Sequence, residues 1–214
     1  MLDLIFAEPM ALVRGAGVTL FITVVSSLAG TLLGTMLWSV SRGGIGLLMR
    51  PICDVLRIVP NLVIIFLVYY FPYVHFSLTP LSPLWSATLG LTIAQAAYTF
   101  DVVRTSWALI PAAQIDGMRS VGACRRTLVR TVYLPNLFRL SWAPHVALWI
   151  GNLKLSSLAS VIGAPDLAYV ARVTAANTFR LFEAWIAISI IYVILFLPLI
   201  FIGRRVERLA IFRQ

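Results

Sequence analysis

The chain has 214 residues, of which 60% are hydrophobic and only 12% are charged. Soluble domains are about 45 to 50% apolar and about 25% charged, so this composition excludes an ordinary soluble protein and indicates an all-α integral membrane protein. Lysine and arginine (17) outnumber aspartate and glutamate (8). In a membrane protein this excess marks the loops held on the cytoplasmic side, and we do not attribute it to nucleic acid binding.

Five apolar runs are candidates to cross the roughly 30 Å of hydrocarbon in a bilayer. They cover approximately residues 17–40, 59–73, 84–103, 137–162 and 182–202. The second run is short, and we expect it to borrow a turn or two from residues 53–58. Ser26, Gly30 and Gly34 lie four residues apart in the first run, and small residues at this spacing let helices pack closely in lipid. We therefore predict one transmembrane bundle of about five helices over residues 1–214.

Arginines are distributed unevenly between the two ends of these runs. They follow the first run, follow the third run at Arg104 and close the chain, whereas the loop after the second run, residues 74–83, has no lysine or arginine. The positive-inside rule then places the N-terminus outside and the C-terminus in the cytosol.

A polar, arginine-rich stretch, residues 106–136, separates the third run from the fourth. Pro111 suits the first turn of a helix and Gly122 suits the left-handed position that ends one. The stretch therefore reads as helix, glycine turn and helix, with Pro135 at the start of a further helix.

The first of these short helices is amphipathic. Ile115, Met118 and Val121 recur at helical spacing, so one face is suited to packing against another surface. A cytosolic loop without a partner is the alternative.

This stretch resembles the EAA coupling loop of permease subunits in bacterial ATP-driven (ABC) importers. The residues that the resemblance assigns to ATPase coupling are Asp116, Gly117, Met118, Arg119, Gly122, Leu134 and Pro135. Asp, Gly and Met stand where Glu, Ala and Ala are usual. The carboxylate is kept, but Gly117 weakens the helix by about 1 kcal/mol relative to alanine.

Four more segments resemble the polar amino acid uptake permeases of this family, in the same order along the chain. They are LVRGAGVTL (12–20), RIVP (57–60), AYTFDVVR (97–104) and KLSSLASVIGAPDL (154–167). The resemblance implies an inner-membrane permease that imports a polar amino acid or a close derivative such as an opine. It also implies two cytosolic ATPase subunits, a second permease chain, identical or different, and a substrate-binding protein outside.

Catalysis is expected to lie outside this chain. It has no glycine-rich phosphate loop, so ATP and Mg²⁺ are expected on the ATPase subunits, and we predict neither enzymatic activity nor a bound cofactor. The histidines and cysteines do not lie at metal-ligand spacing, so no metal site is expected.

Five polar residues of the predicted spans are candidates for a substrate pathway or gate: Asn61, Tyr98, Asp101, Asn152 and Lys154. Lys154 costs about 2.5 to 3.5 kcal/mol at a helix centre, and either a cavity or an ion pair or interface position would relieve that cost. Asp101 shares a helical face with Arg104, which favours a salt bridge. The uncharged residues either line a pathway or bond helices together.

Two other classes of membrane protein fit the sequence less well than an importer does. An ion-driven carrier or channel is disfavoured by the lack of an internal repeat. An intramembrane enzyme needs several converging acids, histidines or serines, whereas Asp101 is the only acid in the spans apart from Glu183 at the end of one.

Overall fold

The computed structural model describes residues 9–42, 46–76, 79 and 81–211, and all the secondary structure in these residues is helical. The prediction of an all-α fold is confirmed. In chain order the elements are α2 (Pro9–Val40), α3 (Gly46–Ile58), α4 (Asn61–Phe76), α5 (Pro83–Ala108), α6 (Ala112–Ser120), α7 (Arg125–Leu128), the π-helical turn η1 (Val129–Tyr133), α8 (Leu134–Leu155), the 3-10 helix η2 (Ser156–Ile162), α9 (Leu167–Thr178) and α10 (Leu181–Ile211).

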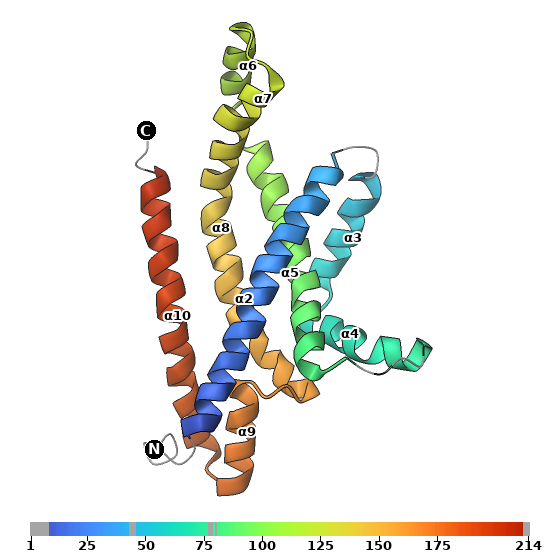
Figure 1. The fold of residues 1–214 in the computed structure, drawn as a ribbon, viewed down its shortest axis with the longest axis vertical. Helices are drawn as coiled ribbons and strands as arrows, with labels where there is room; N and C mark the ends of the chain where they lie inside the picture. The colour runs from blue at the N-terminus through green and yellow to red at the C-terminus, as the bar shows by residue number, and fades with distance from the viewer. Residues whose placement is uncertain (1–8, 43–45, 77–78, 80, 212–214) are drawn as a thin grey trace.

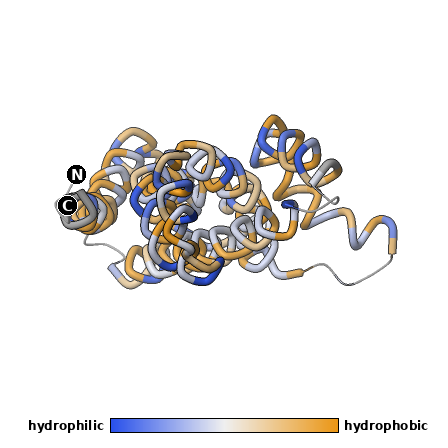
Figure 2. Tube along the Cα trace, turned by 90° about the horizontal axis from the view of Figure 1, so that it is seen from above, coloured by the Kyte–Doolittle hydropathy of each residue, from blue (hydrophilic) through white to orange (hydrophobic). Residues whose placement is uncertain are grey.

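Helix α5 is the central helix of the bundle. It packs against α2, α3, α4 and α8, and most extensively against α2. The α6–α7 hairpin and the C-terminal end of α10 lie at one end of the long axis, and the N-terminal end of α2 lies with α9 at the other (Figure 1). Seen along that axis, apolar residues dominate the chain, and α4 projects away from the side where the chain ends (Figure 2).

The interface between α2 and α5 is packed closely through small residues. Gly30 and Gly34 are buried, and a Cβ atom on them would meet the side chain of Gln95 and the backbone of Ala96, respectively. Ser26 is buried on the same helix. The close helix packing predicted from this spacing is confirmed, and α5 is the neighbour that requires it.

The second predicted span is bent. Helix α3 ends at Ile58, α4 begins at Asn61, and their axes differ by 104°. Pro60 accounts for the break, because a proline lacks an N–H donor and pushes the preceding residue out of the helical region. Residues 53–58, from which this short span was expected to borrow a turn or two, belong to α3, so they add to the span only across the bend.

Three helices among the described residues are long and apolar enough to cross a membrane, and the bent α3–α4 pair adds a fourth if it is counted as one span. The three are Pro9–Val40, Arg125–Ile162 and Leu181–Glu207. The remaining predicted run lies in α5, which has 26 residues but many Ala, Gly, Ser and Thr. Its central position explains this composition, because small residues let neighbouring helices approach.

Candidate functional site

The α6–α7 hairpin has the predicted helix, glycine turn and helix. Pro111 directly precedes α6, and Gly122 after it has φ +76°. The N–H of Gly122 donates to the carbonyl of Arg119 (2.9 Å), and the N–H of Ala123 donates to that of Met118 (3.0 Å). These bonds satisfy carbonyls at the helix end, and only glycine adopts the left-handed conformation without strain.

The root of the hairpin is held by an apolar cluster within the chain. Ile110, Leu128 and Val132 are buried there, and Ile115 and Met118 of α6 pack on them. Two of the three residues of the predicted apolar face of α6 therefore pack against a surface of this chain itself. The third residue of that predicted face, Val121, is instead 76% exposed.

The opposite face of α6 is the surface open to a partner. Asp116, Gly117 and Arg119 are exposed, and a Cβ on Gly117 would meet nothing within 4 Å. Asp116 and Arg119 form a loose surface pair, 3.9 Å apart and each more than 60% exposed, which adds little stability. The hairpin thus presents an acid, a base and bare backbone to the solvent, while the coupling candidate Met118 points toward the root.

Leu134 and Pro135 lie at the base of the hairpin and not at its tip. Pro135 lies in the first turn of α8, as predicted, although the chain is already helical from α7 through η1 into α8. In η1 the N–H of Leu134 donates to the carbonyl of Val129, five residues back. This wider turn accommodates Pro135, which has no N–H and whose ring would collide with the carbonyl four residues earlier in a regular α-helix.

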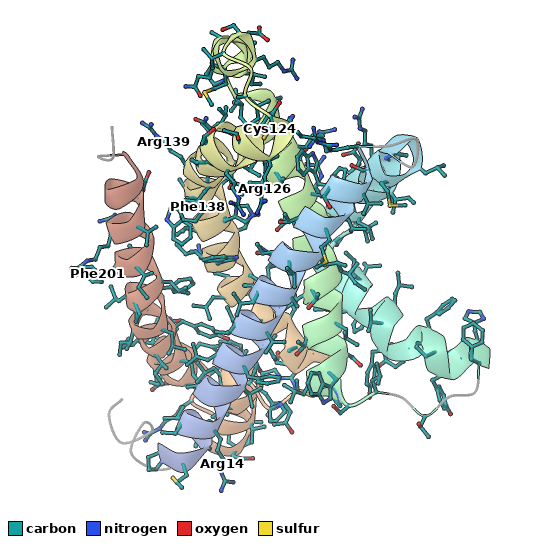
Figure 3. The ribbon with its side chains drawn as sticks, turned by 45° about the horizontal axis from the view of Figure 1, so that its top comes forward. Arg14, Cys124, Arg126, Phe138, Arg139 and Phe201 are labelled. Atoms are coloured by element: carbon teal, nitrogen blue, oxygen red, sulfur yellow. The ribbon has the colours of Figure 1, made fainter. Side chains whose placement is uncertain are left out.

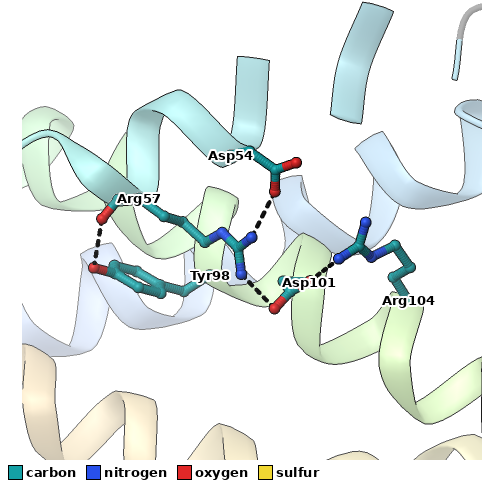
Figure 4. A network of polar contacts seen from close by, with 5 residues as sticks. All are labelled: Asp54, Arg57, Tyr98, Asp101 and Arg104. Atoms are coloured by element: carbon teal, nitrogen blue, oxygen red, sulfur yellow. Dashed lines mark hydrogen bonds and ion pairs between the residues drawn. The ribbon is translucent and has the colours of Figure 1, made fainter. Parts of the chain in front are cut away.

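A cluster of charged residues fastens the α3–α4 bend to α5 (Figure 4). The Arg57 guanidinium donates to Asp54 (2.5 Å) and to Asp101. Asp101 also accepts from Arg104 (2.6 Å), which confirms the predicted pair. The Tyr98 hydroxyl donates to the backbone carbonyl of Arg57 (3.2 Å). We call these five residues the elbow cluster; its two acids and two arginines balance one another.

The structure does not bring the five pathway candidates into one site. Tyr98 and Asp101 belong to the elbow cluster, and Asn61 begins α4 beyond the bend, with its side-chain oxygen buried and without a partner among the described residues. Asn152 is buried elsewhere, and its Nδ2 lies 2.7 Å from Ser26 Oγ and 2.9 Å from Ser27 Oγ. These bonds favour the helix-bonding alternative for Asn152.

Lys154 lies in a separate pocket of about 380 Å³ between α8, α9 and α10. Its Nζ is 5.6 Å from the ring centroid of Phe196, and the ion pairs found among the described residues do not include it. Ser157, Ser189 and Tyr192 also line the pocket. Lys154 is exposed in the chain, and this position is compatible with the cavity and interface alternatives rather than with an internal ion pair.

A second hollow, the α2–α8 groove, lies nearer the hairpin and measures about 280 Å³. Its walls are Thr31, Thr35, Val103, Leu134, Leu137, Phe138, Ser141, Trp142, His145 and Trp149. His145 is buried, with Nδ1 2.7 Å from the Ser141 carbonyl oxygen. No site was expected here from the sequence, because the α2 wall is far along the chain from the α8 wall; Thr31 and Trp149, for example, are 118 positions apart.

Comparison with known proteins decides the family. Residues 26–213 match the family described as binding-protein-dependent transport system inner membrane component. This chain belongs to that family. It is 29% identical over 201 residues to the glutamine transport system permease protein GlnP of Escherichia coli (strain K12), covering 92% of this chain and 91% of that protein.

Two further matches cover most of this permease. The octopine transport system permease protein OccM of Rhizobium radiobacter is 31% identical over 196 residues, covering 87% of this chain and 80% of that protein. The solved structure of an amino acid ABC transporter with histidines has a TM-score of 0.88 and 25% identity, covering 97% of each chain.

Family membership fixes the class of the protein. It is a multi-pass permease subunit of a bacterial inner-membrane ABC transporter and is not itself an enzyme. ATP hydrolysis in such a complex belongs to ATPase partners. The two rival classes, an ion-driven carrier or channel and an intramembrane enzyme, are excluded.

Arg57 and Asp54 of the permease were not among the residues expected from the sequence to form a site. Arg57 was named only within the RIVP segment (57–60), as part of the resemblance, because its main partner Asp101 is 44 residues away in the sequence. The available signal was the spacing of three between Asp54 and Arg57, which places both on one helical face.

Proposed function

We propose that this permease carries a polar amino acid or a close derivative across the inner membrane, driven by two cytosolic ATPase subunits that grip the α6–α7 hairpin. A second permease chain completes the pathway, and a binding protein delivers the substrate from outside. ATP and Mg²⁺ bind to the ATPases. The names of GlnP and OccM, a glutamine and an octopine permease protein, support this substrate class.

The observation that carries the proposal is a firmly rooted hairpin with a solvent-exposed outer face. Ile115 and Met118 fasten α6 to the bundle, while Asp116, Gly117 and Arg119 face solvent. A lever that transmits force needs a rigid attachment and a free contact surface. It transmits only the difference in contact free energy between the two states of the ATPases.

Aromatic contacts connect the hairpin to the rest of the bundle. The rings of Trp107 in α5 and Tyr133 in η1 are stacked with centroids 4.3 Å apart. The Arg42 guanidinium, beyond the end of α2, lies 4.0 Å from the Trp107 ring centroid, a cation–π geometry. Motion of the hairpin therefore acts on the ends of α2 and α5 together.

The proposed orientation places the hairpin and the C-terminal end of α10 in the cytosol. Both lie at the same end of the molecule (Figure 1), and the hairpin carries four exposed arginines, Arg119, Arg125, Arg126 and Arg130. Basic residues near span ends favour the cytoplasmic side. The N-terminal end of α2 then faces outward, as does the segment around Lys154.

Co-expression with the ATPase partners and affinity purification test the proposal. Asp116→Lys reverses the charge at the centre of the free face and should abolish ATPase co-purification and ATP-driven uptake. Arg172→Glu is the matched control, because it reverses an exposed charge on α9 at the opposite end of the molecule. Normal assembly and uptake in both Asp116→Lys and Gly122→Pro would overturn the role of the hairpin.

A further inference from the structure

The α2–α8 groove is open and almost entirely lined by carbon. Phe138, Trp142 and Trp149 supply aromatic walls, and Leu134, Leu137 and Val103 supply aliphatic ones. The groove lies along two helices that cross the membrane. Its contents therefore come from the bilayer or from another protein rather than from water.

The two threonines of the groove are already engaged within the protein. The Trp149 indole donates to the Thr31 hydroxyl (3.0 Å), and the Thr35 hydroxyl donates to the Thr31 carbonyl (2.7 Å). These bonds leave a mainly hydrocarbon surface. A zwitterionic amino acid gains no charged partner here, since the residues that line the groove include neither an acid nor a lysine or arginine.

Exposed arginines of η1, α8 and α10 lie toward the hairpin end of the molecule, and we call them the cationic rim. Arg139 directly follows Phe138, and the two project from α8 just below the hairpin (Figure 3). The Trp142 indole donates to the carbonyl of Gly203 (3.1 Å), which brings the C-terminal end of α10 to the same place. The exposed arginines near this end are Arg130, Arg139, Arg204 and Arg205, and the ion pairs found in the described part of the chain include none of them.

We propose that the α2–α8 groove holds an acyl chain of an anionic phospholipid whose phosphate is bound by Arg139 and the neighbouring arginines. The hydrocarbon walls fit the acyl chain, and the arginines of the rim supply positive charge to pair with the anionic phosphate. Basic pockets between transmembrane helices at the cytoplasmic interface are suited to such headgroups. A second copy of this chain fits less well, because a symmetric contact through this face would bring two arginine rims together.

The test uses the permease assembled with its ATPase partners, delipidated and then titrated with phosphatidylglycerol or phosphatidylcholine. Native mass spectrometry counts the lipids that each complex retains. Wild type should retain phosphatidylglycerol in preference to phosphatidylcholine. Arg139→Gln should lower the phosphatidylglycerol affinity about fivefold, the factor expected for one arginine near the membrane surface.

Two further variants separate the groove from general surface charge. Thr35→Trp fills the groove without changing charge and should reduce retention of both lipids. Arg14→Gln removes an exposed arginine at the opposite end of the molecule (Figure 3) and should leave retention unchanged. Equal loss in Arg14→Gln and Arg139→Gln would overturn the site.

A crosslinking experiment tests the rival occupant. Phe138→Cys places a thiol on the exposed wall of the groove, in a background without the two native cysteines. Absence of disulfide-linked permease dimers supports the lipid. Efficient dimer formation, together with no preference for phosphatidylglycerol, would assign the groove to a second permease chain and overturn the proposal.

Discussion

Arg57 near the end of α3 donates to Asp101 in the C-terminal part of α5, and this contact fixes the bend between α3 and α4 against the central helix. Both side chains are only about a quarter exposed, at 25% and 29%. Charges in such a setting are stable when paired and costly when single. The elbow cluster therefore holds the C-terminal end of α3, just before the bend, against α5 by charge balance and not by apolar packing alone.

Removal of Asp101 should destabilise the permease because Arg57 and Arg104 would lose their shared acceptor. We expect Asp101→Asn to lower the unfolding free energy by about 1 to 3 kcal/mol, measured as a lower thermal midpoint in detergent. Asp101→Glu, which keeps the carboxylate that both arginines share, should recover part of the loss. Asp116→Asn, which removes a carboxylate from an exposed pair, is the control and should have no effect.

The two hairpin glycines should respond oppositely to alanine. Gly117→Ala adds a methyl into open space and strengthens α6 by about 1 kcal/mol. Gly122→Ala forces φ +76° on a residue with a Cβ and costs about 1 to 2 kcal/mol. Amide hydrogen exchange of α6 in the isolated permease should slow in the first variant and accelerate in the second. Equal changes in both would refute the left-handed turn.

Cys124 should report on ATPase docking. It is exposed at the start of α7, whereas Cys53 is 3% exposed. The neighbouring Thr127 hydroxyl lowers the pKa of the Cys124 thiol, which favours the reactive thiolate. A maleimide should label Cys124 in the isolated permease and label it much more slowly in the complex. Unchanged labelling after assembly would place the ATPases elsewhere; Cys53→Ala controls for the second thiol.

Asp166 should make stability depend on pH. Its side chain is fully buried at the start of α9, and burial raises the pKa of Asp166 from 3.8 to about 6. The native state then holds the proton more tightly than the unfolded chain. This contribution is complete below about pH 4 and is lost as the pH rises to about 6, by up to about 3 kcal/mol.

Asp166→Asn isolates that titration. Asn is also a good N-cap, so it can replace the bond from the Tyr169 N–H to Asp166 Oδ1 (2.9 Å) without a charge. The thermal midpoint of the variant should rise relative to wild type between about pH 4 and pH 6. Parallel pH profiles for the two proteins would contradict the assignment.

Lys154→Met should separate stability from transport. The methionine removes a charge that is costly in a span, so the thermal midpoint should not fall. Uptake should nevertheless decline, mainly through a higher apparent KM if Lys154 meets the substrate carboxylate. Lys154→Arg should restore part of the uptake. Full uptake by Lys154→Met would remove this pocket from the pathway.

The features predictable from the sequence were those set by local spacing. Gly122 marked a helix end, Gly30 and Gly34 marked a close helix contact, and the pair of Asp101 and Arg104 followed from one helical turn. Each depends on residues within one segment, where helical periodicity fixes the geometry.

The features that escaped prediction depend on contacts between distant segments. The partners of Asn152 lie more than 120 residues away, and Arg57 meets Asp101 only because the chain bends at Pro60. The direction of that bend leaves no trace in a uniformly apolar run, since α4 has no clear polar face from which to read it.

The π-helical turn η1 fixes the azimuth of the hairpin about the axis of α8. Each residue of an α-helix advances the chain by about 100°, and the wide turn absorbs one residue without that rotation. Were η1 to relax into regular α-helix, the exposed face around Asp116 would swing through roughly that angle. A few backbone hydrogen bonds therefore determine the direction, about the axis of α8, in which the hairpin presents Asp116 to the proposed ATPase contact.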